Sequence, residues 1–363
     1  MVVFLQLTLF CRTDRLMLPV MKKDKITENI GKKLGIPGIV GLLAGRLSGS
    51  ELNSLLLDVF STKLSGLSPA MLLKQYEENR FVHPAGTDMI GLLKLELRVL
   101  EFLRDHHFLP VELSPAAQLG SCSVVGPVDQ KKIVSATRNV ELLADATNAI
   151  ALHVALLKKS LAGGGGGGGI HGGDGEVRSG DAEVRSRDSE AADETMRFCT
   201  VHRHVRTQEL KVKGHTAHFK VGCMLSSGVD RGSCGWETTN LGEHMLTLYQ
   251  LIRGIFGVAG KIWFRLWERG GYEDRQLLME RVVGHLGKTM GDIPVIREDA
   301  PGPNTYYTGI QFKMMIGVDG TDMEIADGGF VDWTQQLLGN RKERLLISGF
   351  GLEMLYKLQN GVL

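Results

Sequence analysis

The stretch that decides the fold lies near the C-terminus and reads Tyr306-Tyr307-Thr308-Gly309, Gly328-Gly329-Phe330-Val331-Asp332 and Gly349-Phe350-Gly351-Leu352-Glu353-Met354-Leu355. Tyrosine hydroxyls need a hydrogen-bond partner when they are buried, and a polar ligand can provide it. The glycine pair lets a strand pass close to a ligand, because glycine has no Cβ. Strand tyrosines and a glycine turn are the simpler interpretation, but the order of the three motifs favours a pocket.

Together the three motifs resemble the end of the catalytic core of histidyl-tRNA synthetase, a class II aminoacyl-tRNA synthetase. That family has YYTG, GGRYD and GxGxER segments in the same order. The resemblance implies an α+β fold in which helices flank an antiparallel sheet. It also implies a ligand pocket formed by Tyr306, Tyr307, Gly328, Gly329, Asp332 and Glu353.

A second part of the resemblance lies in the segment 201–208, followed after a loop by the segment 218–223. The family has FRHERPQ and FHQLGVE there, which form its motif 2. Arg203 matches the motif arginine, and a guanidinium is suited to binding a carboxylate or a phosphate with two parallel donors. The resemblance adds Arg206, Gln208 and Lys220 to the ligand-binding residues. A basic edge strand with solvated side chains is the alternative.

Upstream, the segment 143–148 resembles the family's LRPEGT segment, whose acid and threonine hold the substrate amino group. Asp145 and Thr147 keep that spacing. On an extended chain two residues this far apart face the same side, so both could reach one ammonium. A cap for a helix beginning near Asn148 is an equally good interpretation. Pro115 matches the proline of motif 1, which forms the dimer interface of class II proteins.

The sequence departs from the family where adenylation needs charge. Gly302 and Met354 stand at positions of family arginines, while Lys220 and Met224 replace a glutamine and a glutamate. Loss of one such group typically slows a reaction by orders of magnitude. We therefore expect no standard adenylation of histidine and assign no catalytic residue. We also expect no anticodon-binding domain after Leu363. In lacking that domain, the chain resembles the regulatory subunit of ATP phosphoribosyltransferase.

Composition sets the outer limits. With 363 residues, the chain is expected to form one large or two unequal domains. Its net charge is +1, so the overall charge does not favour tRNA as a partner. The five cysteines lack CxxC spacing, which favours a reducing compartment and predicts a cytoplasmic location. No apolar run is long enough to span a membrane.

Composition also divides the chain. We expect a disordered extension at 1–21, the first part of the core with its helical cover at 22–161, a disordered glycine-rich linker at 162–195 and the rest of the core at 196–363. Hydrophobic spacing predicts helices at 39–64 (with Ser50 as the N-cap), 89–106, 148–159, 239–256, 272–286 and from 352 onward. Alternating patterns predict strands at 107–115, 132–144, 197–206, 218–226 and 261–267.

Several potential metal ligands lie around the hairpin predicted at 197–226: Cys199, His202, His204, His215, His218 and Cys223. Their spacing could supply a tetrahedral zinc site. However, successive strand residues face opposite ways, so His202 and His204 share one face while Cys199 points to the other. We therefore assign no metal.

The sequence thus predicts a diverged synthetase-like protein that binds an amino-acid-like or nucleotide-like ligand in a regulatory or accessory role, with histidine biosynthesis as one setting. ATP and Mg²⁺ are the candidate cofactors. The expected assembly is a homodimer, with a hetero-oligomer containing a partner enzyme as the alternative. A competing hypothesis is an ATP-dependent ligase that adenylates a carboxylate, in which Lys220 or Arg206 replaces a lost cation. A purely structural subunit is the third.

Overall fold

A computed structural model describes residues 24–162, 195–208, 216–258, 260–299, 302, 304–318 and 320–362. The predicted extension at 1–21 lies outside the described residues. So does the predicted linker, apart from Ala162 and Thr195, and so does His215 of the proposed metal ligands.

An eight-stranded sheet lies at the centre of the molecule, with strand order β1-β4-β5-β10-β9-β8-β6-β7. Neighbouring strands are antiparallel except in the outer pairs β1–β4 and β6–β7, which are parallel. The strands are β1 Leu109–Pro110, β4 Met196–Val205, β5 His218–Val229, β6 Ile262–Glu268, β7 Val295–Glu298, β8 Thr308–Val318, β9 Thr321–Val331 and β10 Glu343–Phe350. The predicted α+β fold class is confirmed.

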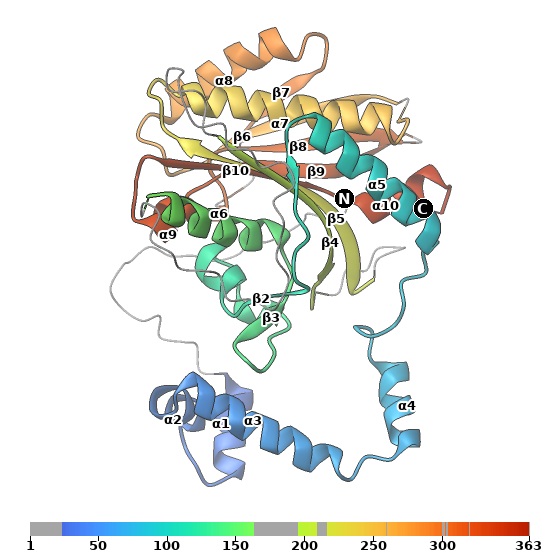
Figure 1. The fold of residues 1–363 in the computed structure, drawn as a ribbon, viewed down its shortest axis with the longest axis vertical. Coiled ribbons are helices and arrows are strands. Elements are labelled where there is room, and N and C mark those ends of the chain that lie inside the picture. The colour runs from blue at the N-terminus through green and yellow to red at the C-terminus, as the bar shows by residue number, and fades with distance from the viewer. Residues whose placement is uncertain are drawn as a thin grey trace.

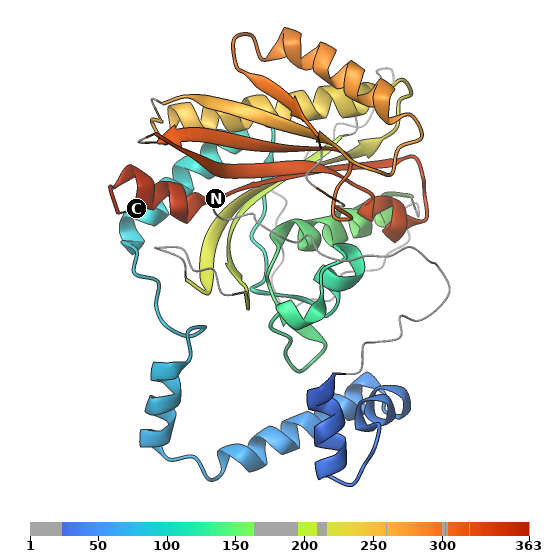
Figure 2. The same cartoon turned by 180° about the vertical axis from the view of Figure 1, so that it is seen from behind.

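Four helices cover one side of the sheet, which we call the helix face: α5 Met89–Asp105, α7 Gly235–Gly254, α8 Arg275–Thr289 and α10 Leu352–Gln359. Figures 1 and 2 show α7 and α8 lying across the sheet, with α5 and α10 close together at one end. The larger apolar core lies between these helices and strand residues such as Cys199, Met224, Phe312, Phe330 and Phe350. Burial of this apolar area provides the main driving force for folding.

The opposite side, which we call the site face, is covered by α6 Ala146–Ala162 and α9 Trp333–Leu338 (Figure 1). A small sheet of β2 Ala116–Gln118 and β3 Val140–Leu142 continues this layer, together with the π-helix η1 Ser121–Val125 and the 3-10 helix η2 Gln130–Lys132. The core on this side includes Phe198, Leu225 and Ile347 together with Tyr306 and Tyr307.

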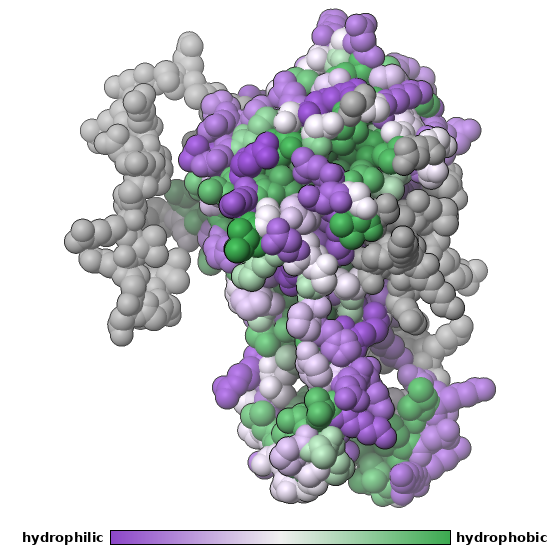
Figure 3. All heavy atoms as spheres, turned by 90° about the vertical axis from the view of Figure 1, so that its right-hand side faces the viewer, coloured by the Kyte–Doolittle hydropathy of each residue, from purple (hydrophilic) through white to green (hydrophobic). Residues whose placement is uncertain are grey.

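The N-terminal helices form a separate layer, which we call the arm: α1 Lys25–Lys33, α2 Ile39–Arg46, α3 Gly49–Leu64 and α4 Pro69–Glu78. They lie apart from the large sheet (Figures 1 and 2), although the sequence assigns them to the helical cover of the core. Apolar side chains such as Leu64 and Leu73 are 60% and 59% exposed, and apolar patches are visible on the arm in Figure 3. Polar contacts attach it, including an ion pair of 2.8 Å between Lys131 and Asp24.

The predicted helix at 39–64 is two helices, and its predicted cap is wrong. Ser48, not Ser50, is the N-cap of α3, because its hydroxyl accepts from the backbone N–H of Glu51 and the Glu51 carboxylate accepts from the N–H of Ser48. This reciprocal pairing is a capping box, which needs an acid three residues after the cap.

Two predicted strands are mostly irregular. Only Leu109 and Pro110 of 107–115 pair with the sheet, and only 140–142 of 132–144 form a strand. Arg138 and Asn139 have φ angles of 66° and 56°, so the chain turns there and interrupts the alternating pattern. The other predicted helices and strands are present, with ends shifted by a few residues. No helix in the described ranges is both long and apolar enough to cross a membrane.

Candidate functional site

The site face is organised around the tyrosine pair. The rings of Tyr306 and Tyr307 are perpendicular, with centroids 4.8 Å apart, and both residues are buried. Asn304 holds the pair in place, because its side-chain oxygen accepts from the backbone N–H of Tyr306 at 2.8 Å and of Tyr307 at 3.4 Å. Trp333 packs edge-on against the Tyr306 ring. Burial raises the pKa of both hydroxyls well above the usual range, so both are donors.

Each tyrosine hydroxyl donates to a different carboxylate. Tyr306 donates to Oδ2 of Asp145 at 2.5 Å, and Tyr307 donates to Oδ2 of Asp327 at 3.1 Å. The other oxygen of Asp145 accepts from the backbone N–H and the hydroxyl of Thr147. Asp145 therefore caps α6, as one of the two interpretations of the sequence predicts, and also contacts the tyrosine pair.

Asp327 is a site residue that the sequence reasoning missed. It lies two residues before Gly329 on β9, and this spacing places both on one face of a strand. Burial, then the nearby charge of Glu324, raises the pKa of Asp327 well above its usual range, although the hydrogen bond from Tyr307 works in the opposite direction. The motif comparison selected Asp332 instead, which follows β9 and accepts from the Gln336 side chain.

Several buried polar groups in the described part of the chain lack a protein partner, and two of them lie on β4 and face this side: His204 and Thr200. His204 accepts from the backbone N–H of Ala146 through Nε2, so its neutral ring carries the proton on Nδ1, and Nδ1 has no partner. Burial, then the charge of Arg206, lowers the pKa of His204 to about 3. The Thr200 hydroxyl also has no partner. Such groups typically bind water or a ligand.

The structure does not bring all the predicted site residues together. Four of them lie on the helix face: Arg203, Lys220, Gly328 and Glu353. Arg203 and Lys220 are paired across β4 and β5, on the same face as Cys199 and Met224. Glu353 on α10 binds the Arg203 guanidinium at 3.1 Å, and Lys220 forms an ion pair of 2.6 Å with Glu96 on α5.

Glu353 completes this second network. Its carboxylate also accepts from the Thr87 hydroxyl at 2.7 Å and the backbone N–H of Lys220 at 3.1 Å, and it pairs with Lys357. Burial disfavours its charge, but the Thr87 hydrogen bond and the charges of Arg203 and Lys357 outweigh burial and lower its pKa. The carboxylate is therefore an ionised structural anchor under the helices.

The remaining predicted residues divide between the site and its surroundings. Arg206 lies near the site face, where its Nε donates to the Ala144 carbonyl at 3.2 Å and its guanidinium stacks over the Phe219 ring. A Cβ on Gly329 would lie 2.8 Å from Cδ1 of Tyr307, so this glycine makes room for the ring. A Cβ on Gly328 would instead meet Phe312 in the helix-face core. Gln208 is half-buried after the end of β4.

The residues present do not fit a nucleotide bound as the resemblance implies. Met354 is buried in the helix-face core, and the Arg203 charge is neutralised on that same face. Within the described residues no group of three or more His, Cys, Asp or Glu side chains is arranged to hold a metal ion. Cys199 donates its thiol to the Phe108 carbonyl on the helix face, away from His204.

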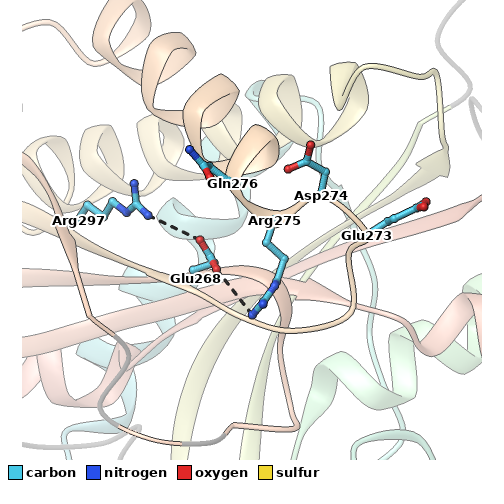
Figure 4. A pocket seen from close by; sticks show the side chains of 6 residues that line it. All are labelled: Glu268, Glu273, Asp274, Arg275, Gln276 and Arg297. Atoms are coloured by element: carbon cyan, nitrogen blue, oxygen red, sulfur yellow. Dashed lines mark ion pairs between the residues drawn. The ribbon is translucent and has the colours of Figure 1, made fainter.

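One open polar hollow of about 370 Å³ lies beyond the end of β6, at the start of α8 (Figure 4). Its lining residues are Glu268, Glu273, Asp274, Arg275, Gln276 and Arg297. Glu268 lies between Arg275 and Arg297, at 3.7 Å and 3.6 Å from their guanidinium nitrogens. Both arginines are already paired with Glu268, so we do not assign the ligand site here.

No protein-family model and no curated protein matches the chain. Solved structures do match. The apo histidyl-tRNA synthetase of S. aureus superposes with a TM-score of 0.54 and 12% identity, over 78% of this chain and 71% of that one. The putative threonyl-tRNA synthetase ThrRS-1 of Aeropyrum pernix gives 0.52 and 10%, over 74% and 59%. An ATP phosphoribosyltransferase regulatory subunit/histidyl-tRNA synthetase of Bacillus halodurans gives 0.50 and 13%, over 77% and 84%.

The chain has a class II tRNA synthetase fold. The predicted resemblance is therefore confirmed for the fold. At these identities the likeness extends no further than the fold, and function has to be argued from the site. On the site face of this fold a carboxylate contacts a tyrosine pair, while Arg203 and Lys220, two of the predicted ligand-binding cations, lie on the helix face.

Proposed function

We propose that this protein binds a free amino acid on the site face without activating it, in a regulatory or accessory role. The observation that carries the proposal is the contact between Tyr306 and Asp145. It places a half-buried carboxylate, which is suited to an ammonium group, beside a buried aromatic pair, which is suited to a side chain. His204 and Thr200 add polar groups that still need partners.

The positions of the cations argue against the ligase alternative. A ligase needs positive charge at the phosphates of ATP. Lys220, one of the two residues proposed to replace a lost cation, binds Glu96 on the other side of the sheet. Arg206, the second, has its Nε on a backbone carbonyl and its guanidinium over Phe219. Adenylation therefore has little support.

The regulatory role rests on the comparison with the B. halodurans structure, whose name includes a regulatory subunit of ATP phosphoribosyltransferase. A chain of this fold that binds an amino acid without activating it is suited to regulating a partner enzyme in response to the concentration of that amino acid. The homodimer, with the hetero-oligomer as its alternative, and the cytoplasmic location belong to the same proposal.

Isothermal titration of the full chain with each free amino acid, beginning with histidine, tests the proposal. Asp145→Asn should weaken binding roughly tenfold or more, because a hydrogen bond to a charged group contributes about 1.5–3 kcal/mol and about 1.4 kcal/mol is tenfold. Asp58→Asn, at an exposed position on the arm, is the matched control and should leave the affinity unchanged. Pyrophosphate exchange with ATP should stay at background.

Two results would contradict the proposal. The first is a wild-type chain that binds no amino acid. The second is equal affinity in wild type and Asp145→Asn, which would leave the carboxylate with its structural role only. Exchange above background with any amino acid would favour the ligase.

A further inference from the structure

Arg269 is a buried arginine at the end of β6 that no sequence motif selected. Only 6% of the residue is exposed. It follows Glu268, and the alternation of β6 places it on the site face with Gln311, whose strand position is opposite Trp267. Its backbone N–H donates to the carbonyl of Gly309 at 2.6 Å, and Gly309 lies two residues after Tyr307 in the chain.

The guanidinium is held by neutral groups alone in the described part of the chain. Nε and Nη2 donate to the side-chain oxygen of Gln311 at 3.0 and 2.7 Å, and Nη1 donates to the Gly302 carbonyl at 2.9 Å. Burial lowers the pKa of Arg269, whereas the nearby Tyr307 raises it. A buried cation without an opposite charge is costly, so proteins seldom keep one without a use for it.

Hydrogen bonds connect this cation to the rest of the site. The Gln311 oxygen that accepts from Arg269 also accepts from Asn304 at 3.2 Å, and Asn304 holds the backbone of both tyrosines. Arg269 and Asp145 therefore lie on one network that passes through the tyrosine pair. One end of this network is positively charged and the other end is a carboxylate.

We propose that Arg269 binds the carboxylate of an α-amino acid whose ammonium group is bound by Asp145. This inference rests on the proposed function and adds the residue that binds the carboxylate of the ligand. A guanidinium has five N–H donors, and the three protein contacts leave one N–H on each terminal nitrogen. These two donors suit the two oxygens of a carboxylate, and the single charges match.

The nearby charges favour a carboxylate over a phosphate. A phosphate carries more negative charge than one guanidinium neutralises. Lys313, opposite Asp327 on the site face, forms an ion pair of 2.8 Å with Glu324 and is therefore neutralised. Arg206 lies near the same face, where its Nε donates to the Ala144 carbonyl and its guanidinium stacks over the Phe219 ring. Among the described residues, Arg269 is the cation that is hydrogen-bonded into the network of the tyrosine pair.

The test compares amino acids with the amines that lack their carboxylate: histidine with histamine, tyrosine with tyramine and tryptophan with tryptamine. Each is titrated into the full-length wild type, Arg269→Gln and the control Arg297→Gln, an arginine 54% exposed at the open hollow. Arg269→Gln should weaken amino-acid binding roughly tenfold to a hundredfold and leave amine binding unchanged. Arg269→Lys keeps the charge but loses the fork, so an intermediate loss is expected.

The outcomes separate this inference from the proposed function. If Arg269→Gln weakens the binding of amino acid and amine equally, or changes the binding of neither, Arg269 has a structural role and the inference is wrong. If the variant does not fold, the wild type still decides, because equal affinity for histidine and histamine, or for another pair, excludes a carboxylate contact. Binding of amines alone would keep Asp145 as the ammonium site and reject Arg269. Binding of neither class refutes the proposed function and this inference with it.

Discussion

The two faces of the sheet contain similar charged residues in different states. On the helix face, Glu353 meets two cations, and Lys220 meets Glu96. On the site face, Arg269 has neutral partners and Asp327 meets a tyrosine. In our proposal, the ion pairs of the first face stabilise the fold, whereas Arg269 on the second face binds a ligand. Four substitutions test this contrast.

The largest effect is expected for Glu353→Ala on the helix face. The side chain is 2% exposed, and its loss removes the carboxylate that pairs with the Arg203 guanidinium. Breaking a buried ion pair on one side typically costs about 3–5 kcal/mol. The free energy of unfolding from urea titration should fall by that amount.

The exposed Glu273→Ala is the control for this change, and its effect should stay within about 0.5 kcal/mol. A small loss in Glu353→Ala, comparable to that of Glu273→Ala, would show that the helix-face network does not stabilise the fold.

The adjacent glycines on β9 provide a matched pair, because each would place a Cβ on a different face. The Cβ added by Gly328→Ala would clash with the Ile347 carbonyl and the Phe312 ring. The Cβ added by Gly329→Ala would clash with the Ile310 carbonyl and the Tyr307 ring. Overpacking should lower stability in both by about 1–3 kcal/mol. Only Gly329→Ala should also change the tyrosine signal in near-ultraviolet circular dichroism and weaken amino-acid binding. Equal spectral and binding changes in both variants would remove the distinction between the faces.

Near pH 4 the smallest effect is expected for Asp327→Asn, and this effect grows as the pH rises. The native pKa of Asp327 is raised above the ordinary 3.8, so its proton stabilises the fold at low pH and this contribution is lost as pH rises through the native pKa. The amide has no proton to lose. From about pH 4 upward, the variant should therefore gain on wild type by up to about 1.4 kcal/mol per pH unit until the native pKa is passed.

Denaturation series at several pH values measure this difference. Parallel stability profiles for wild type and Asp327→Asn would mean that Asp327 is ionised in the folded chain. Asp327 would then be a charged residue of the site face and not a protonated one.

The motifs were sufficient to predict the fold, but they did not predict which way each side chain points. Alternating patterns placed β4, β5 and β6 correctly. A shift of one residue in a strand moves a side chain to the opposite face. Arg203 and Lys220 were matched to ligand-binding positions, yet the pairing of β4 with β5 places both on the helix face and His202 and His204 on the other.

Residues that act through distant partners were missed for a different reason. Asp327 becomes distinctive only because Tyr307, just before the neighbouring strand β8, donates to it, and Arg269 only because its hydrogen-bond partners among the described residues are neutral. Neither fact is local in sequence. By contrast, Asp145 was selected by its match to the family's LRPEGT segment, which is local in sequence, whereas its contact with Tyr306 is visible only in the fold.

The arm has a consequence for the cooperativity of unfolding. None of the residues of α2, α3 and α4 is buried, so no apolar core joins these helices to the sheet. Helices of this length are marginal in water on their own. The arm and the sheet are therefore separate cooperative units, and heating should melt them in two steps. A single melting temperature for this chain would describe only one of the two units.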